Sequence, residues 1–341
     1  MDSQVFILNE KRNVTLTAYL QDDSQEFWRA KKRPAVVIFP GGAYAYCSDR
    51  EADPVAQEYL RAGYHAFVLR YSVGWENAVW PNPLEDYDQA MELIAAHAKE
   101  WHLIPEKIAV IGFSAGGHLA ACAATMAKHR PAAAILAYPV ILEGLAAICA
   151  KGAPGADKAV DSQTCPCFIA AAGTDTTVSA MNSLRFVEAL YENGISAELH
   201  LYAFGPHGFS TARTSIADPA ELCSRTLHWV EDSISWLEDV FGAFTSGEMS
   251  RPRCPGRVRK DKDPYLSVDC LLATIAGNQI AVERLNQLIL VEETTQKWIA
   301  EQKENLLTSE MTLRSALQFL NVPGEVIRKA DEILSEIPNR K

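Results

Sequence analysis

Apolar residues follow two patterns along the first 245 residues. Short continuous apolar runs predict strands buried on both faces, as the strands of parallel sheets are. These runs cover residues 34–39, 65–71, 107–113, 132–138 and 167–172, and an alternating run covers 196–202. Two alternating segments at the start, 4–8 and 13–20, predict antiparallel edge strands.

Between these runs, apolar residues recur every three or four positions, which is typical of helices with one buried face. We expect such helices directly after Ser114, over 53–62, 83–98 and 181–193, and from Val230 to a point near 243. Strand and helix therefore alternate. The predicted fold class is α/β, a doubly wound, mostly parallel sheet in residues 1–245.

A different pattern begins after residue 245. Residues 246–264 are polar and contain prolines, arginines and lysines, so we expect an exposed linker there. Residues 265–341 predict a small all-α appendage, with helices over 266–275, 280–290, 295–307, 312–320 and 324–333.

The appendage resembles no family that we recognise. We expect its apolar residues to be too small a set to form a robust core alone, among them Leu285, Leu288, Ile289, Trp298 and Ile299. They should therefore bury against the same subunit's body, a second copy or another protein, and we favour homo-oligomerisation through these helices. Acidic and basic residues balance over 246–341, which does not favour a nucleic-acid-reading helix pair.

Composition narrows the functional classes. Of the 341 residues 48% are hydrophobic, enough for a large core, and the formal net charge is −11. That charge repels phosphate backbones, so no nucleic-acid partner is expected. The chain has no apolar stretch of 18 residues, and its first ten residues lack a basic, apolar leader. We therefore predict no membrane partner and a cytoplasmic protein.

Cysteine and histidine spacing predicts neither a metal nor a cofactor. The eight cysteines fall singly on apolar segments, as free thiols in a reducing compartment do. Cys165-Pro166-Cys167 lacks the C-x-x-C spacing and a second pair that a zinc site needs.

A Gly-Phe-Ser-Ala-Gly turn at 112–116 joins a predicted strand to a helix. This is the context of a nucleophile elbow with Ser114 at its tip. Side chains at Gly112 or Gly116 would collide with the neighbouring strand and helix. The free N–H groups at the start of the helix favour an oxyanion beside the hydroxyl. The alternative is an ordinary strand-to-helix connection with a surface serine.

Asp175 and His207 each follow another predicted strand, at 167–172 and 196–202. Ligands of doubly wound sheets bind at the carboxyl ends of strands. We therefore expect Ser114, Asp175 and His207 at one edge of the sheet.

The order Ser114, Asp175, His207 resembles the order nucleophile, acid, base in α/β-hydrolases. Residues 15–243 are similar to the esterase/lipase branch that includes acetyl-xylan-esterase-like and feruloyl-esterase-like enzymes. The similarity rests on Pro40-Gly41-Gly42-Ala43-Tyr44, Asp49-Arg50-Glu51, Val68-Leu69-Arg70-Tyr71, Pro83-Leu84-Glu85-Asp86, the elbow through His118, Asp175-Thr176-Thr177-Val178 and His207-Gly208-Phe209. It implies a backbone oxyanion hole formed by Gly41, Gly42, Ala43 and Ala115.

This sequence departs from the family pattern at two places. Ala43 stands where the family usually has a third glycine, although the turn still offers main-chain N–H groups. The stretch 143–163 is shorter than in relatives, so substrate contacts from that region are not carried over.

In the implied triad, His207 accepts the Ser114 proton and returns it to the leaving alcohol, while Asp175 fixes the imidazole tautomer. His118 is a rival base, because its i+4 position puts it on the same helix face as Ser114. It lies one turn deeper against the sheet, whereas His207 follows a strand on a loop. Glu143, after the preceding strand, is the alternative acid.

The predicted function is a serine carboxylesterase acting on short acyl esters, acetyl esters of carbohydrate above all. The 143–163 loop is rich in alanine and glycine and no long apolar lid is present, so little surface is available to bury a fatty tail. Two alternatives stay open. One is a serine peptidase or amidase on the same fold, which would normally bring a large gating domain. The other is an inactive hydrolase-fold binding protein, against which the intact Ser114, Asp175 and His207 argue. The expected partner is a small-molecule ester such as an acetylated oligosaccharide.

Overall fold

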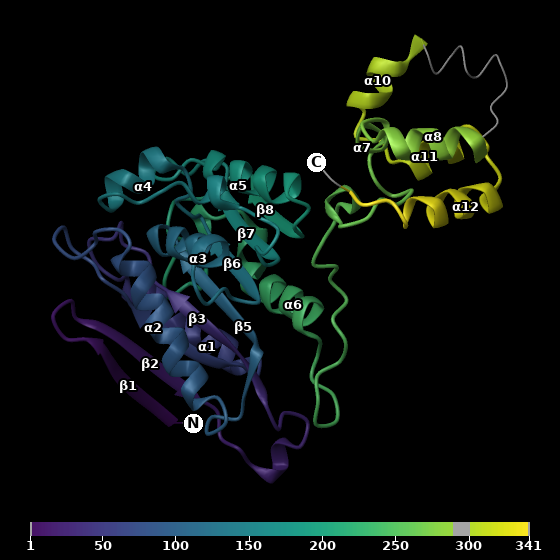
Figure 1. Ribbon diagram of the computed structural model, residues 1–341. Coiled ribbons are helices and arrows are strands. Elements are labelled where there is room, and N and C mark those ends of the chain that lie inside the picture. The colour runs from purple at the N-terminus through teal and green to yellow at the C-terminus, as the bar shows by residue number, and fades with distance from the viewer. Residues whose placement is uncertain (1, 289–300, 340–341) are drawn as a thin grey trace. The chain divides into compact units, whose positions relative to one another are not determined.

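The computed structural model describes residues 2–288 and 301–339. The chain divides into two units, Met1–Gly256 and Arg257–Lys341 (Figure 1). The boundary falls inside the stretch 246–264 that was expected to be a linker.

An eight-stranded sheet forms the centre of the first unit, in the order β1-β2-β4-β3-β5-β6-β7-β8. β1 (Asp2–Asn9) pairs antiparallel with β2 (Val14–Leu20), which pairs antiparallel with β4 (His65–Arg70). All other pairs are parallel, and they add β3 (Arg33–Phe39), β5 (Leu103–Phe113), β6 (Ala133–Ala137), β7 (Cys167–Ala172) and β8 (Ala197–Tyr202). The predicted α/β class with a doubly wound, mostly parallel sheet is confirmed.

Helices bury both faces of this sheet. Val37 and Phe39 of β3 belong to a core with α2 (Asn82–His97), α3 (Ala115–Met126) and α5 (Met181–Glu192). Val36 and Ile38 belong to a core with α1 (Asp53–Arg61) and α6 (Trp229–Phe241). Successive side chains of a strand point to opposite faces, so a strand covered on both sides is apolar throughout.

The stretch 143–163 is not the loop that was expected. It contains α4 (Glu143–Cys149) and a 3-10 turn at Ala156–Ala159. Ala146, Ala153 and Ala156 are buried in the same core as α3. Small side chains let this segment pack closely against the elbow helix, and a high alanine content therefore does not indicate an irregular loop here.

In the second unit the described helices are α7 (Leu272–Ala276), α8 (Gln279–Leu288), α10 (Lys303–Thr308), α11 (Leu313–Phe319) and α12 (Gly324–Leu334). The helix expected over 266–275 is wrong in its first part. Leu266, Val268 and Cys270 are buried and the residues between them are less so, which is the period of an extended segment. Parts of the helices predicted over 280–290 and 295–307, with Ile289, Trp298 and Ile299, lie outside the described residues.

The second unit has a hydrophobic core of its own, so the expectation that its apolar residues are too few was wrong. The extended segment contributes three side chains to this core. The core consists of Leu266, Val268, Cys270, Ile275, Ala281, Leu285, Leu313, Leu317, Ile327, Ala330, Leu334 and Ile337.

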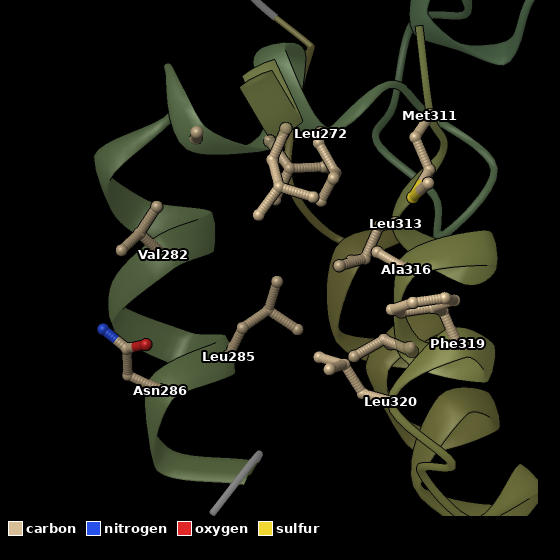
Figure 2. A pocket seen from close by; sticks show the side chains of 13 residues that line it. Leu272, Val282, Leu285, Asn286, Met311, Leu313, Ala316, Phe319 and Leu320 are labelled. Atoms are coloured by element: carbon tan, nitrogen blue, oxygen red, sulfur yellow. The ribbon is translucent and has the colours of Figure 1, made fainter. Parts of the chain in front are cut away.

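The second unit also contains an apolar pocket of about 410 Å³. Leu285 of α8 and Leu320, which follows α11, lie on opposite sides of it (Figure 2). Among the described residues that line it, Asn286 alone has a polar side chain.

The predicted linker is not exposed throughout. Asp261 is buried, and its carboxylate accepts hydrogen bonds from the Arg259 guanidinium. Its carbonyl oxygen accepts another from the Asn339 side-chain amide at 2.7 Å. Residues near 261 are therefore part of the second unit.

Candidate active site

Ser114 occupies a strained backbone position between β5 and α3, with φ 53° and ψ −114°. The two glycines of the turn make this possible. A Cβ at Gly112 would lie 2.1 Å from the Gly116 carbonyl oxygen, and a Cβ at Gly116 would lie 2.1 Å from that of Phe39. The predicted steric reason for both glycines is confirmed.

The structure brings Ser114, His207 and Asp175 together at the carboxyl ends of β5, β8 and β7. His207 Nε2 lies 2.9 Å from Ser114 Oγ. His207 Nδ1 lies 2.6 Å from Asp175 Oδ2. Because an ionised carboxylate only accepts hydrogen bonds, Nδ1 carries the proton and Nε2 is free to accept the one from the serine hydroxyl. This is the tautomer that a serine-activating base requires.

Asp175 is fixed on its other oxygen as well. Oδ1 accepts the amide hydrogens of Thr177 at 2.8 Å and Val178 at 2.9 Å. Burial raises the pKa of Asp175, but the hydrogen bonds from His207 and these amides outweigh it, and the net pKa is lowered. The carboxylate is therefore ionised at neutral pH and can stabilise an imidazolium.

The expected oxyanion donors are not equivalent. The Gly41 amide donates to Glu51 Oε2 at 2.8 Å, so this N–H is already used. Within residues 2–288 and 301–339, the amides of Gly42, Ala43 and Ala115 donate no hydrogen bond. Gly41 is accordingly removed from the candidate donors, and the other three residues stay.

Ala43 has a backbone conformation that glycine adopts more readily than alanine does. Its φ is 54°, in the left-handed region. Gly42 has a φ of 124°, and a Cβ there would lie 2.3 Å from the Tyr46 carbonyl oxygen. Alanine is therefore accommodated at position 43, with some strain, whereas position 42 requires glycine.

His118, the rival base, is used elsewhere. Its Nε2–H donates to the Pro154 carbonyl at 2.8 Å, and its Nδ1 accepts from the Tyr44 hydroxyl at 2.8 Å. Burial lowers the pKa of His118 to about 4, so the ring is neutral at neutral pH. Glu143, the alternative acid, is on the surface and pairs with Lys158 at 2.6 Å.

Glu51 and Tyr138 join the site, and sequence reasoning gave them no role. Glu51 is 2% exposed, and its Oε1 accepts the Tyr138 hydroxyl hydrogen at 2.7 Å. That hydroxyl oxygen accepts the Ser210 amide hydrogen at 2.9 Å. The Tyr138 ring also packs edge-on against His207, with centroids 4.9 Å apart. Glu51 was part of a recognised motif, but no sequence signal connects it to a tyrosine 87 residues away.

In the described part of the chain, no group of three His, Cys, Asp or Glu side chains is arranged to hold a metal ion. Among the same residues, every helix is too short or too polar to cross a membrane.

The sheet, the strained serine turn and the Ser-His-Asp geometry together define an α/β-hydrolase fold. Residues 26–140 match the BD-FAE family model. Endo-1,4-beta-xylanase B of Butyrivibrio fibrisolvens is 31% identical over 229 residues, which are 58% of this chain and 35% of that protein. The acetylxylan esterase of Xylanibacter ruminicola is 30% identical over 197 residues, 51% of this chain and 41% of that protein.

One solved structure is similar to this protein over nearly the whole of its own length. MGS-M1, an α/β-hydrolase enzyme from a Medee basin deep-sea metagenome library, is 41% identical with a TM-score of 0.64, covering 70% of this chain and 98% of that one. The chain belongs to the esterase branch of the α/β-hydrolase superfamily, and the resemblance inferred from its motifs is confirmed. The match spans well under half the length of the xylanase and the acetylxylan esterase.

Proposed function

We propose that this protein is a serine carboxylesterase that hydrolyses short acyl esters of carbohydrate, with Ser114 as nucleophile. The observation that carries the proposal is the continuous relay from Asp175 through His207 to Ser114, with heavy-atom distances of 2.6 and 2.9 Å. These are ordinary hydrogen-bond distances for proton transfer by a general base.

The reaction has two balanced halves. Ser114 Oγ attacks the ester carbonyl carbon while His207 Nε2 takes the hydroxyl proton. The tetrahedral intermediate then breaks its bond to the alcohol oxygen, which leaves with the proton from His207. Water repeats the sequence on the acyl-enzyme, releasing the carboxylic acid and restoring the serine.

The oxyanion is stabilised by main-chain amides. Ala115 is the first residue of α3, so its N–H has no partner within the helix. Gly42 and Ala43 offer theirs from the turn after β3. One such donor typically contributes about 3–4 kcal/mol to the transition state.

Two lines of support favour an acetylated carbohydrate as substrate. One relative is named an acetylxylan esterase. In addition, α4 and the turn at Ala156–Ala159 bury small alanine side chains against α3. Burying a methylene of a longer acyl chain contributes about 0.8 kcal/mol, and each one would require new apolar surface in the site. Acetyl and propionyl esters should therefore be turned over faster than octanoyl esters.

The test is hydrolysis of p-nitrophenyl acetate by the full chain and by Ser114→Ala. We expect the variant to lose about 10⁴-fold or more in kcat while its thermal unfolding is unchanged, because the hydroxyl supplies the covalent step. Ser3→Ala, at an exposed serine of β1, is the matched control. A Ser114→Ala enzyme with near-normal turnover would overturn the proposal. Aminoacyl p-nitroanilides, tested in parallel, measure any amidase activity.

A further inference from the structure

Two aromatic side chains are exposed on loops beside the turn that carries Gly42 and Ala43. Trp75 is 83% exposed and Tyr46 is 61% exposed. Tryptophan is usually well buried in folded proteins, so an indole with most of its surface in water calls for a reason. Trp75 is the most exposed of the large hydrophobic side chains in the described residues.

Tyr46 and the nucleophile lie beside the same glycine turn. A Cβ on Gly42 would be 3.2 Å from Cδ2 of the Tyr46 ring, and a Cβ on the preceding Gly41 would be 3.1 Å from the Ser114 Cβ. The Tyr46 ring therefore lies next to Gly42, and Ser114 lies next to Gly41. Its hydroxyl makes no hydrogen bond to any residue that the structure describes.

Trp75 is attached to the same turn from the neighbouring strand. It belongs to the loop after β4, and β4 is the partner of β3 in the sheet. The Gly74 amide donates to the Tyr44 carbonyl at 2.8 Å, which ties the two loops together. A Cβ at Gly74 would meet no atom within 4 Å, so the space beside Trp75 is open.

We propose that Tyr46 and Trp75 are a binding platform for a sugar ring of the ester substrate. The inference rests on the proposed function and names the part of the site that holds the saccharide. A pyranose has a face of C–H groups that packs on an aromatic ring, while its hydroxyls stay in water or bond to a polar tip such as the Tyr46 hydroxyl. A platform on an open loop surface suits such a two-faced ligand. A fatty acyl chain needs an enclosed apolar pocket to remove all of its surface from water.

The experiment measures selectivity, which separates the platform from catalysis. The kcat/KM for acetylated oligosaccharides of xylose, glucose and mannose is divided by that for p-nitrophenyl acetate. For Trp75→Ala and Tyr46→Ala we expect the ratio for the best saccharide to fall at least fivefold each, chiefly through KM, and more in the double variant. Trp75→Phe, which keeps a ring, should recover most of the ratio.

The matched controls are Trp28→Ala and Tyr191→Ala. Both side chains are about half exposed, at 53% and 51%. Trp28 precedes β3 and Tyr191 precedes β8, so both lie toward the amino ends of the strands, whereas Ser114 lies at their carboxyl ends. Their ratios should equal that of the wild type.

A second readout does not need hydrolysis. Xylotetraose binding to Ser114→Ala is titrated by calorimetry, with and without Trp75→Ala, alongside the glucose and mannose tetrasaccharides. Weaker binding of the best tetrasaccharide when Trp75→Ala is added to Ser114→Ala supports the platform. The platform would be overturned by unchanged selectivity, with or without a loss of self-association, or by an equal loss of activity on saccharide and aryl esters. It would also be overturned if none of the three sugars bound. If the wild type fails to hydrolyse p-nitrophenyl acetate at all, the proposed function fails instead, and the binding titration still decides on the platform.

Discussion

Two histidines lie close to Ser114, and their surroundings give them different chemistry. The His207 side chain is 18% exposed, and one nitrogen faces the serine while the other faces Asp175. His118 has no exposed surface, and both of its nitrogens are hydrogen-bonded within the interior. Residue type allowed both residues as bases, helical spacing made His118 the rival, and only His207 has a nitrogen left for the hydroxyl proton. His118 instead holds the Tyr44 side chain and the carbonyl of Pro154.

His118 should make the protein acid-sensitive. Burial lowers its pKa in the folded state to about 4 from the ordinary value of 6.5. The unfolded chain therefore binds the proton more tightly, so this contribution to stability is complete above pH 6.5 and is lost as the pH falls toward 4. Between pH 7 and pH 5 the free energy of unfolding should drop by about 2 kcal/mol from this residue alone.

The measurement is urea unfolding at pH 5, 6 and 7, followed by tryptophan fluorescence, since six of the seven tryptophans precede residue 257. His118→Gln, which cannot titrate, should be less stable than the wild type at pH 7 and approach it at pH 5. His65→Gln should behave in the same way, because burial also lowers the pKa of His65 to about 4. A constant gap between His118→Gln and the wild type at all three pH values would contradict the prediction.

At the scale of elements, a buried network joins the loops that follow β3, β6 and β8. Glu51 accepts from Gly41 on one oxygen and from Tyr138 on the other. Tyr138 accepts from Ser210, three residues after His207. The oxyanion turn and the histidine loop are therefore held to the same carboxylate. A buried acceptor that loses one of its donors costs about 1–3 kcal/mol, so the network is sensitive to change at any of its members.

Glu51→Gln should impair catalysis without removing any group that touches substrate. The amide cannot accept from both Gly41 and Tyr138, so the turn and the loop are free to shift relative to each other. A displacement of about 1 Å in an active site can cost 10²-fold, and we expect kcat on p-nitrophenyl acetate to fall about 10- to 100-fold with a smaller change in KM. Glu143→Gln, at the surface, is the control. A Glu51→Gln enzyme with a lower Tm but normal kcat would show that the network serves only the fold.

The sequence predicted elements where one physical signal dominates. The parallel strands were correct because burial on both faces makes them continuously apolar, and the edge β1–β2 pair was correct because it alternates. The error at 266–271 arose because Leu266, Val268 and Cys270 fit a helical spacing loosely and an alternating one fully. The Ser114, Asp175 and His207 side chains were expected at one edge because each follows a parallel strand. The Glu51–Tyr138 contact could not be predicted, since it depends on side-chain packing between distant loops.

At the scale of the whole molecule, the border between the units is set by backbone hydrogen bonds. The amides of Arg253 and Cys254 donate to the Asp239 carbonyl at 2.8 and 2.9 Å, and the Ser196 amide donates to that of Gly256 at 3.3 Å. Residues up to 256 are therefore attached to α6 and to the start of β8. A catalytic unit that ended at residue 245 would lose these hydrogen bonds, so residue 256 is the better C-terminal boundary for it.

Truncation after Gly256 should keep the chemistry and change the assembly. All residues of the relay and of the oxyanion turn precede residue 210, and the two cores that cover the sheet are formed within the first unit. We expect kcat on p-nitrophenyl acetate within severalfold of the full chain.

The second unit has its own core and an apolar pocket with a 67% exposed phenylalanine, Phe319, in its lining (Figure 2). Exposed apolar surface of this kind favours association, so by light scattering the truncated protein should have fewer chains per particle than the full-length protein does. Phe319→Ser in the full chain is the matched variant, and it should lower the mass while leaving turnover unchanged. Equal association of the full and truncated chains would refute a role for the second unit in assembly, and a folded but inactive truncated enzyme would show that this unit completes the substrate site.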